Sequence, residues 1–371
     1  ASSANTTTLR SAGNLTLQGY SYAASGSGRG VDLNNDVIAA SGTVSMSGQH
    51  NTGATYAISL SGSTSITAGT GVTLESLNDN TGTIALLSSG GIDGGSGTVL
   101  MRAANYAFGG ADRTITTTGV LTIQPDADEN SFASSFDNQY LNPVSVTGLT
   151  LGKSSNASAI TLSRAISLSG PVSIYGGSID VNANITANSG NILLDADTGS
   201  TLNQSSTGIL LDDAITIETV TSGNLTLIGR SGDTGSGFDG IDASSANTTT
   251  LRSAGNLTLQ GYSYAASGSG RGVDLNNDVI AASGTVSMTG QHNTGATYAL
   301  SLSGSTSITA GTGVTLESLN NNTGTIALLS SGGINGGSGT VLMRAANYAF
   351  GGADRTITTT GVLTIQPDAD E

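Results

Sequence analysis

Paired carboxylates are the first residues in this sequence that could carry out chemistry. Asp212 and Asp213 are adjacent, and Asp195 and Asp197 are separated by one residue. Two acids that flank a glycosidic bond can act as general acid and general base, and a cation can stabilise the charge that develops. The arginines to watch for that role are Arg102, Arg113 and Arg164. Because acidic pairs in turns are usually solvated, we interpret these carboxylates as surface groups and predict no catalytic residue.

The two histidines do not supply a better catalytic group. His50 and His292 occupy the same position in two copies of one sequence, in the turns SGQHNTG and TGQHNTG, with no acidic neighbour. Surface turns are therefore predicted for both. Asp79 and Asp93 are replaced by Asn in the second copy, which argues against an essential acid or ligand. The sequence contains no nucleophile elbow, Walker loop or HExxH motif, so we predict that the protein is not an enzyme.

Calcium is the one metal worth weighing, because hard oxygen ligands are all that this chain can offer. Residues 235–242, GSGFDGID, partly resemble the GGxGxDxUx nonapeptide of calcium-binding β-rolls. Thr234 replaces the first Gly, and the motif occurs once, whereas a roll site takes ligands from two successive turns. We interpret the run as an ordinary Gly-rich loop. The prediction is thus no metal site and no cofactor, with a calcium site as the alternative.

The overall composition excludes several classes of partner. The chain has 371 residues, 26 of them acidic and 11 basic, a net charge of −15 and no cysteine. Nucleic acids and anionic membrane surfaces need clustered basic residues, so neither is expected as a partner. The lack of cysteine excludes disulfides, thiolate metal sites and cysteine nucleophiles. No apolar stretch approaches the ~18 residues of a membrane span, so membrane insertion is not expected.

A long internal repeat organises the chain. Residues 1–129 recur as residues 243–371, at an offset of 242. We therefore divide the chain into one full unit, residues 1–242, with 130–242 as its second part, and the beginning of the next unit, residues 243–371. The two copies differ at four positions, namely Ser47 and Thr289, Ile58 and Leu300, Asp79 and Asn321, and Asp93 and Asn335. The chain stops inside the run QPDADE, and we expect it to be a window from a longer tandem array.

Short alternating segments predict β-strands throughout the chain. Leu15–Thr16–Leu17 and Val72–Thr73–Leu74 are typical, since they place aliphatic residues on one face and Thr on the other. Almost no helix is expected, because no stretch shows a period of 3.6 residues with caps. The clearest run, residues 160–194, has inward residues at steps of six or seven: Ile160, Ile166, Val172, Ile179, Ile185 and Ile192.

Steps of six to seven residues predict a β-solenoid with three short strands per coil. Three steps give about 19 residues per coil, and a 242-residue unit would then hold roughly 10–12 coils with the ordinary strand spacing of ~4.8 Å. The expected fold class is all-β, a right-handed parallel β-helix, by the crossover preference of parallel strands. A string of β-sandwich modules is the alternative fold, with domain breaks every ~100 residues.

Three loops interrupt the strand pattern. The longest, residues 125–143, is predicted to protrude, and it combines acidic and aromatic residues: Asp126, Asp128, Glu129, Phe132, Phe136, Asp137 and Tyr140. It is either a contact to a neighbouring filament or ligand, or an insertion whose aromatic residues cover the groove beside the core. The loops around Tyr20–Tyr22 and Tyr106–Phe108 suit carbohydrate stacking and self-association equally. Asn14, Asn191 and Asn224 precede strands and are candidates for ladders at the corners of the coil, with plain turn propensity as the alternative.

The strand motifs resemble a known family. The motifs concerned are GNLTLQG (13–19), GVTLES (71–76), GLTLGK (148–153), ISLSGPVSIYGGSIDVNANITANSGNILL (166–194) and GNLTLIG (223–229). They resemble the β-solenoid repeats of filamentous-haemagglutinin-like bacterial proteins, in particular the giant tandem-repeat surface proteins of Gram-negative bacteria. The resemblance implies a parallel β-helix, export to the bacterial cell surface, and a structural or adhesive role. It carries over no catalytic residue.

The sequence therefore predicts a structural component of a long extracellular bacterial filament or fibrous adhesin, acting as a rigid fibre, spacer or stalk. Its expected partner is itself, either as a continuation of the same chain or as an end-to-end or lateral homopolymer. Surface glycans are a second class of partner. The alternative function is a carbohydrate-binding or polysaccharide-lyase-like β-helix.

Overall fold

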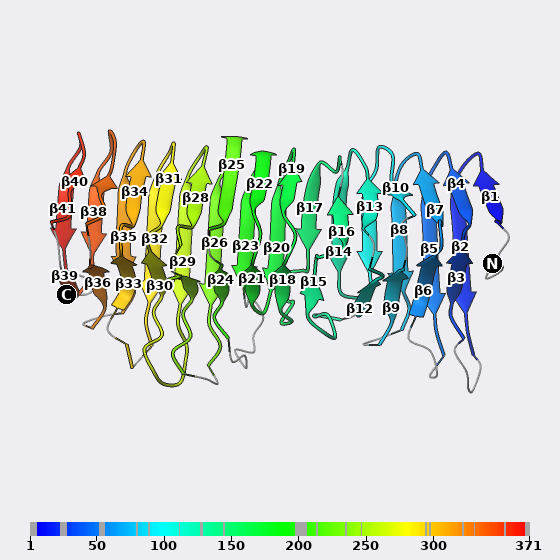
Figure 1. The fold of residues 1–371 in the computed structure, drawn as a ribbon, viewed down its shortest axis with the longest axis horizontal. Coiled ribbons are helices and arrows are strands. Elements are labelled where there is room, and N and C mark those ends of the chain that lie inside the picture. Colours follow the sequence, from blue (N-terminus) through cyan, green and yellow to red (C-terminus); the bar gives the residue numbers. More distant parts are fainter. Residues whose placement is uncertain are drawn as a thin grey trace. The chain divides into compact units, whose positions relative to one another are not determined.

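The segments in which aliphatic residues alternate with Thr and Ser form β-strands in the computed structural model of the chain (Figure 1). The structure describes residues 6–22, 28–51, 56–78, 81–87, 90–110, 112–126, 129–143, 145–196, 206–212, 214–233, 236–245, 247–293, 295–296, 298–320, 323–329, 331–351 and 354–367. None of these residues is helical, and none belongs to a helix that could cross a membrane. The chain divides into two compact units, residues 1–158 and 159–371, which are described separately.

Unit 1 is built from three parallel sheets. The first contains, in spatial order, β1 (Thr8–Ser11), β4 (Val37–Ala40), β7 (Ser65–Ala68), β10 (Ile92–Asp93), β13 (Arg113–Thr116) and β16 (Leu141–Pro143). The second contains β2 (Leu15–Tyr20), β5 (Val44–Gln49), β8 (Val72–Ser76), β11 (Val99–Arg102), β14 (Val120–Gln124) and β17 (Gly148–Leu151). The third contains β3 (Val31–Asn34), β6 (Tyr56–Ser61), β9 (Thr83–Leu86) and β12 (Asn105–Phe108). The short strand β15 (Phe136–Asp137) comes later in the chain and is not part of this four-stranded sheet.

Unit 2 repeats this plan. One sheet contains β18 (Ile160–Leu162), β21 (Ile179–Val181), β24 (Ile209–Leu211), β27 (Ile241–Ala243), β30 (Val273–Asn276), β33 (Tyr298–Ser303), β36 (Thr325–Leu328) and β39 (Asn347–Phe350). Another contains β19 (Ile166–Leu168), β22 (Ile185–Ser189), β25 (Thr216–Ser222), β28 (Thr250–Ser253), β31 (Val279–Ala282), β34 (Ser307–Ala310), β37 (Ile334–Asn335) and β40 (Ile357–Thr358). The last contains β20 (Val172–Gly176), β23 (Ile192–Ala196), β26 (Leu225–Arg230), β29 (Leu257–Tyr262), β32 (Val286–Gln291), β35 (Val314–Ser318), β38 (Val341–Arg344) and β41 (Leu363–Gln366).

Successive strands of the chain enter the three sheets in turn, so each coil contributes one strand to each sheet. Every described neighbour pair is parallel, as between β5 and β8, where Val44 lies opposite Val72 and Met46 opposite Leu74. The predicted fold class is therefore confirmed: the protein is an all-β parallel β-helix with three strands per coil. The alternative of β-sandwich modules, which would be antiparallel, is excluded for the described strands.

The predicted length of the coil is correct for only one stretch. Ile160 lies opposite Ile179 and Ile166 opposite Ile185, as the predicted steps of six and seven require. Elsewhere the coils are longer, since Leu15 lies opposite Val44 in unit 1 and Leu225 opposite Leu257 in unit 2. The prediction of one short coil length for the whole chain, and the number of coils based on it, is thus wrong. The strands there are short as well, and the additional residues of each coil are in the loops between strands.

The core is a stack of aliphatic side chains from all three sheets. Val44, Met46 and Leu74 are fully buried, whereas the intervening Ser45 and Thr73 point outward. Because each strand bonds to the coils before and after it, its backbone groups are satisfied without a helix. The alternation in the sequence therefore defines the inside of each coil.

Two features fix the corners. At the turn between β29 and β30 the backbones of Gly261 and Gly272 approach so closely that a Cβ on Gly261 would lie 1.9 Å from the Gly272 carbonyl oxygen, which only glycine permits. At another corner, the Oδ1 of Asn191 accepts from the backbone N–H of Asn224 at 2.8 Å, and the Oδ1 of Asn224 accepts from that of Asn256 at 2.9 Å. The candidate ladder at the corners therefore exists, and it runs from side chain to backbone.

Candidate functional site

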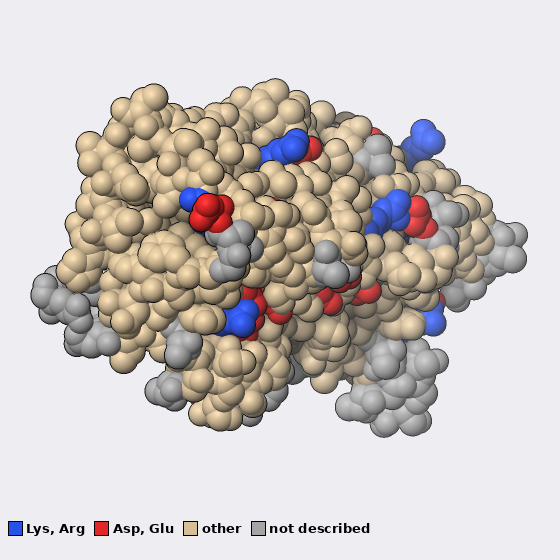
Figure 2. Space-filling model, turned by 60° about the vertical axis from the view of Figure 1, so that its left-hand side comes forward, with Lys and Arg blue, Asp and Glu red and all other residues tan. Residues whose placement is uncertain are grey.

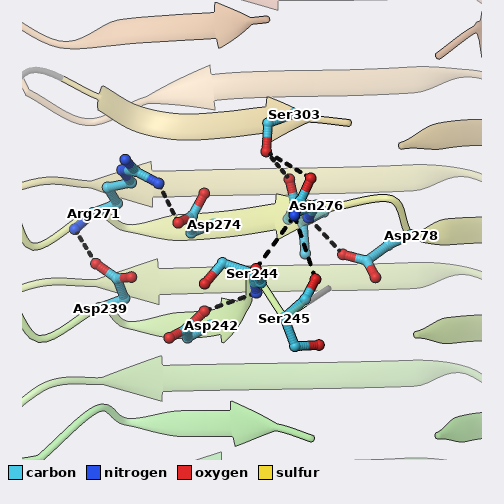
Figure 3. Close-up of polar contacts among 10 residues, drawn as sticks. Asp239, Asp242, Ser244, Ser245, Arg271, Asp274, Asn276, Asp278 and Ser303 are labelled. Atoms are coloured by element: carbon cyan, nitrogen blue, oxygen red, sulfur yellow. Dashed lines mark hydrogen bonds and ion pairs between the residues drawn. The ribbon is translucent and has the colours of Figure 1, made fainter. Parts of the chain in front are cut away.

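Three aspartates meet on the outer face of two neighbouring coils in unit 2. β27 and β30 are adjacent and parallel, and Asp242 lies directly opposite Asp274 in their register. Ile241 and Val273 point into the core, so these two aspartates point outward. Asp239, just before β27, turns toward the same place, as Figure 3 shows. One carboxylate oxygen from each of the three lies within 4.8 Å of those of the other two.

One arginine serves this carboxylate cluster, by which we mean Asp239, Asp242 and Asp274. The guanidinium of Arg271 forms an ion pair with Asp274, and its backbone N–H donates to Asp239 Oδ1 at 2.5 Å. The guanidinium also lies over the ring of Tyr298, 5.8 Å from its centroid. Among the described residues, three carboxylates thus share a single positive side chain.

The cluster is mostly shielded from water. Asp239 is 9% exposed and Asp274 is 4% exposed, while Asp242 is half-buried. Burial raises the pKa of Asp239 to about 7, helped by the charges of Asp274 and Asp242 and opposed by Arg271. Burial also raises the pKa of Asp274, against the attraction of Arg271. When its carboxylates are ionised, the site therefore holds more negative charge than its protein environment compensates.

Two buried polar atoms at this place have no hydrogen-bond partner among the described residues. One is Oδ1 of Asp274, and the other is the hydroxyl of Ser301, which is 1% exposed and lies opposite Asp274 in the next coil. Ser301 is near enough to lower the pKa of Asp274, although the two make no hydrogen bond of ordinary length and angle. Such atoms are uncommon in folded proteins and call for a reason.

The turn after β30 is held by a separate polar network. Asp278 is fully buried, and its two carboxylate oxygens accept from the backbone N–H groups of Thr249 and Asn276, each at 2.9 Å. The Asn276 amide in turn donates to the backbone oxygens of Ser244 and Ser245 (Figure 3). These bonds join the coils of β27 and β30 and so keep Asp242 beside Asp274.

Sequence reasoning found only part of this cluster. The run 235–242 drew attention to Asp239 and Asp242, although Thr234 and Gly235 lie outside the described residues. Asp274 was missed, because the predicted coil is too short to bring position 274 opposite position 242, where the structure places it. The signal that would have revealed the pair is the recurrence of the LTLIG and LTLQG strands, at Leu225 and Leu257, with the same offset.

A hollow of about 750 Å³ lies beside the turns after β29 and β32. Its lining includes Tyr264, Gln291, His292, Asn293, Asn320 and Thr323. His292 and Asn293 are each 6% exposed, so the prediction that this histidine lies on the surface is wrong. The Nδ1 of His292 lies 2.5 Å from the Asn293 carbonyl oxygen. Nε2 of His292 and Oδ1 of Asn293 have no partner among the described residues.

His50, the same residue in the first copy, is also buried, with 8% of its surface exposed. Its backbone N–H donates to the Asn78 side chain at 2.7 Å, and its Nδ1 lies 2.6 Å from the Asn51 carbonyl oxygen. The Asn78 amide donates back to the His50 carbonyl at 3.0 Å. The turn that contains His50 is therefore held to the turn of the next coil by Asn78.

The arginines considered for polysaccharide chemistry have three different environments. Arg113 is fully buried and donates to the backbone carbonyls of Leu60 and Thr64, so it is not accessible to a polymer. Arg102 faces outward on β11, 3.5 Å from Glu75. Arg164 lies in unit 2, half-buried in the turn between β18 and β19.

The structure describes only one member of each acidic pair. Asp195 forms an ion pair with Arg230 at 2.9 Å, and burial raises its pKa against that attraction. Asp212 is exposed after β24. Asp197 and Asp213 lie outside the described residues.

The natural replacement of Asp93 by Asn335 has a structural explanation. Oδ1 of Asp93 accepts from the backbone N–H of Gly95 at 2.9 Å, and Oδ1 of Asn335 accepts from that of Gly337 at the same distance. A carboxylate and an amide oxygen serve equally here, so the turn does not require a charge. Asp79 and Asn321 lie outside the described residues.

The aromatic residues of the long loop pack inward. Phe132 and Phe136 are each 4% exposed and contact the ring of Tyr106 edge-on, with centroids 5.8 and 5.7 Å away. Of the two interpretations of residues 125–143, the described aromatic residues favour the one in which they cover the groove beside the core. Asp128 lies outside the described residues.

The charged surface is sparse. Figure 2 shows a few charged groups on a largely uncharged face, and most blue groups lie beside a red one. Several arginines form ion pairs with acidic side chains, as between Arg344 and Glu317 at 2.8 Å and between Arg29 and Asp32 at 2.8 Å. The carboxylate cluster departs from the pattern because acids outnumber bases in it.

Comparison with known proteins identified no relative. No family model, no curated protein and no solved structure matches the chain. The architecture itself, all-strand and parallel, is that of a β-solenoid.

Proposed function

We propose that this chain is a segment of a long extracellular bacterial filament or fibrous adhesin, in which tandem 242-residue units form a rigid fibre, spacer or stalk. The role is mechanical and not enzymatic. The observation that carries the proposal is the agreement between the two copies. Leu15 lies opposite Val44 in the first copy and Leu257 lies opposite Val286 in the second, and the neighbouring pairs follow the same register.

Equivalent register in both copies supports unlimited extension. A unit that bonds to the next coil through the same strands can be added repeatedly, because each coil contacts only its neighbours. The polar outer faces of Thr, Ser and Asn, with few charges, suit a surface that should not stick laterally. The resemblance to haemagglutinin-like surface proteins supports a location on the bacterial cell surface.

The test is to lengthen the chain and measure it. Appending further copies of residues 130–371 continues the repeat without a break in phase. If the added coils resemble those described, each added copy should lengthen a continuous rod by about nine layers, or ~40 Å at a layer spacing of ~4.8 Å. Electron microscopy of arrays with one to four added copies gives this increment. A beaded or collapsed particle would contradict the proposal.

Homotypic association belongs to the same proposal. β1, β2 and β3 begin their sheets, and β39, β40 and β41 end theirs. Open strand edges are templates for further pairing. Sedimentation of the 371-residue chain should therefore show end-to-end oligomers whose size grows with concentration, whereas a monomer at all concentrations would argue against pairing through these edges.

Glycan binding is the second candidate function, and the hollow beside β29 and β32 favours it. Nε2 of His292 and Oδ1 of Asn293 are buried acceptors beside the hollow with no partner among the described residues, so a hydroxyl-rich ligand that reached them would supply the missing donors. Tyr264 adds an aromatic face of the kind on which sugar rings stack.

A glycan array followed by calorimetry tests this second function. A neutral oligosaccharide should bind, and Tyr264→Ala should abolish the binding. Tyr22→Ala is the matched control, because Tyr22 is the same residue in the first copy and is 81% exposed. An array with no bound neutral glycan would remove this candidate.

A further inference from the structure

We propose that Asp239, Asp242 and Asp274 form a calcium site at the junction between one 242-residue unit and the next. All three lie in compact unit 2, but Asp239 and Asp242 are at the end of the first 242-residue repeat, and Asp274 belongs to the second repeat. The ligands therefore come from two successive coils, those of β27 and β30, at the boundary between the two sequence repeats.

Charge is the first argument. Asp242 and Asp274 are stacked in register with no residue between them, and Asp239 adds a third carboxylate. Within the described part of the chain, Arg271 is the one cation placed against them. With all three carboxylates ionised, two negative charges are left over, which a divalent cation would neutralise. Parallel in-register pairing of like charges is otherwise unfavourable.

Geometry and ligand type favour calcium among divalent cations. Carboxylate oxygens are hard ligands, which calcium binds at 2.3–2.6 Å, so two oxygens on one ion can be up to about 5 Å apart. The three oxygens lie within 4.8 Å of one another, so a calcium ion between them could be reached by all three with at most small side-chain adjustments. Magnesium binds at 2.0–2.1 Å, which brings even opposite ligands to about 4.2 Å, and it demands octahedral geometry. Structural zinc sites are built from Cys and His ligands, which the cluster lacks.

The unsatisfied polar atoms are an independent observation that points to a ligand. Oδ1 of Asp274 and the hydroxyl of Ser301 are both buried and have no hydrogen-bond partner among the described residues. Ser301 lies on the same outward face, opposite Asp274. A cation held by Asp274 would occupy the free oxygen and leave the hydroxyl available as a neutral ligand or as a donor to a bound water.

The position gives the cation a mechanical role. The first copy has the corresponding pair of Arg29 and Asp32, but β3 begins its sheet, so no aspartates of a preceding coil face Asp32 among the described residues. A tandem array would repeat the full cluster at every junction. One calcium ion per junction would then tie each 242-residue repeat to the next. This mechanical role rests on the proposed function. Calcium binding by the 371-residue chain does not depend on it.

Calorimetric titration of the 371-residue chain with calcium chloride, after removal of metal with EDTA, tests the site. One calcium ion per chain is expected, with a dissociation constant of about 0.1–1 mM, as in extracellular modules. Asp242→Asn should weaken binding roughly tenfold or more, because it removes one charged ligand of three without changing shape. Asp239→Asn should have the same effect. Magnesium should bind more weakly than calcium.

Asp32→Asn is the matched control. It removes the same carboxylate from the same Arg–Asp pair in the first copy, and calcium binding should stay within about twofold of the unaltered chain. The proposal is wrong if the unaltered chain shows no calcium-dependent heat, if both Asp242→Asn and Asp239→Asn bind normally, or if Asp32→Asn weakens binding equally. Unbroken rods in EDTA without any calcium binding would overturn this inference and leave the proposed function standing, whereas calcium binding without rods would do the reverse.

Discussion

The two copies of the repeat have almost the same sequence but different neighbours. Leu15 and Leu17 on β2 are only half-buried, whereas the same residues on β29, Leu257 and Leu259, are fully buried beneath the coil of β26. The opposite holds at the other end of the copy. Ile123 on β14 is fully buried, while its equivalent on β41, Ile365, is 48% exposed.

The register does not follow this difference in burial, although the strands of the exposed coil are shorter, as with β40 compared with its equivalent β13. β14 pairs with β11, and β41 pairs with β38, through the same residues in each copy. A coil therefore adopts its strands and turns from its own sequence and one neighbour. The second neighbour supplies the burial of the same side chains, and with it most of the hydrophobic stabilisation.

Truncating the same isoleucine in each copy should give the largest difference in the free energy of unfolding. Ile123→Ala should lower the free energy of unfolding by about 2–5 kcal/mol, because it opens a cavity in a closed core. Ile365→Ala removes a half-exposed side chain and should cost less than about 1 kcal/mol. Urea denaturation followed by circular dichroism measures both. Equal losses would mean that the neighbouring coil contributes little.

The buried arginine offers a second contrast. Arg113 is fully buried and its guanidinium reaches back to the Leu60 carbonyl at 3.2 Å, whereas Arg355 is only partly buried and reaches the Thr306 carbonyl at 3.2 Å. Lysine keeps the charge but cannot present a planar fork of donors. Arg113→Lys should cost about 1–3 kcal/mol, since buried carbonyls lose their donors, and Arg355→Lys less than about 1 kcal/mol. Thermal unfolding of the two variants checks the order, and a larger loss at Arg355 would contradict it.

Stability should fall with rising pH because of a buried acid in the second copy. Burial raises the pKa of Asp278 to about 7, against two backbone N–H donors and with added repulsion from Asp274 and Asp242. The folded chain therefore holds a proton at pH 5 that the unfolded chain has released, and this contribution to stability is lost as pH rises through about 7.

For this one group the loss between pH 5 and pH 7 is at most about 2 kcal/mol. Urea denaturation in EDTA at several pH values measures it, and Asp278→Asn should flatten the dependence. A free energy of unfolding that rises over this range would show that other groups dominate.

The smallest effect is expected where evolution has already exchanged a residue. Asp93→Asn copies the second copy's Asn335, which accepts the same turn hydrogen bond. The free energy of unfolding should change by less than about 0.5 kcal/mol, because Asp93 is exposed. Thermal unfolding at neutral pH is sufficient. A loss above about 1 kcal/mol would show that the carboxylate does more than hold the turn.

Much of the fold could be predicted because the strand pattern is local. In residues 160–194 every predicted inward residue is buried, and the predicted pairs are opposite one another, as with Val172 and Ile192. The coil is shortest there, since β20 and β21 are separated by only Gly177 and Ser178. Between β29 and β30 the same corner contains residues 263–272. Extra residues at one corner lengthen the coil without changing the strand pattern, so the strand pattern does not reveal the coil length.

The candidate site could be predicted only in part for the same reason. A glycine-rich run with two aspartates is visible in one segment, but the third aspartate, Asp274, belongs to the next coil. Nothing in the local pattern near Asp274 differs from that near Asp32, which has the same neighbours in sequence. Their side chains are nevertheless 5% and 28% exposed.

The sequence by itself determined which residues form strands, which faces point inward and that the chain repeats, because alternation and turn chemistry act over a few residues. The tertiary structure alone decided how far apart paired residues are, which copies of a side chain are buried and where acids meet. These properties depend on the length of the loops between strands and on the presence of a neighbouring coil, and neither is encoded in the segment that it affects.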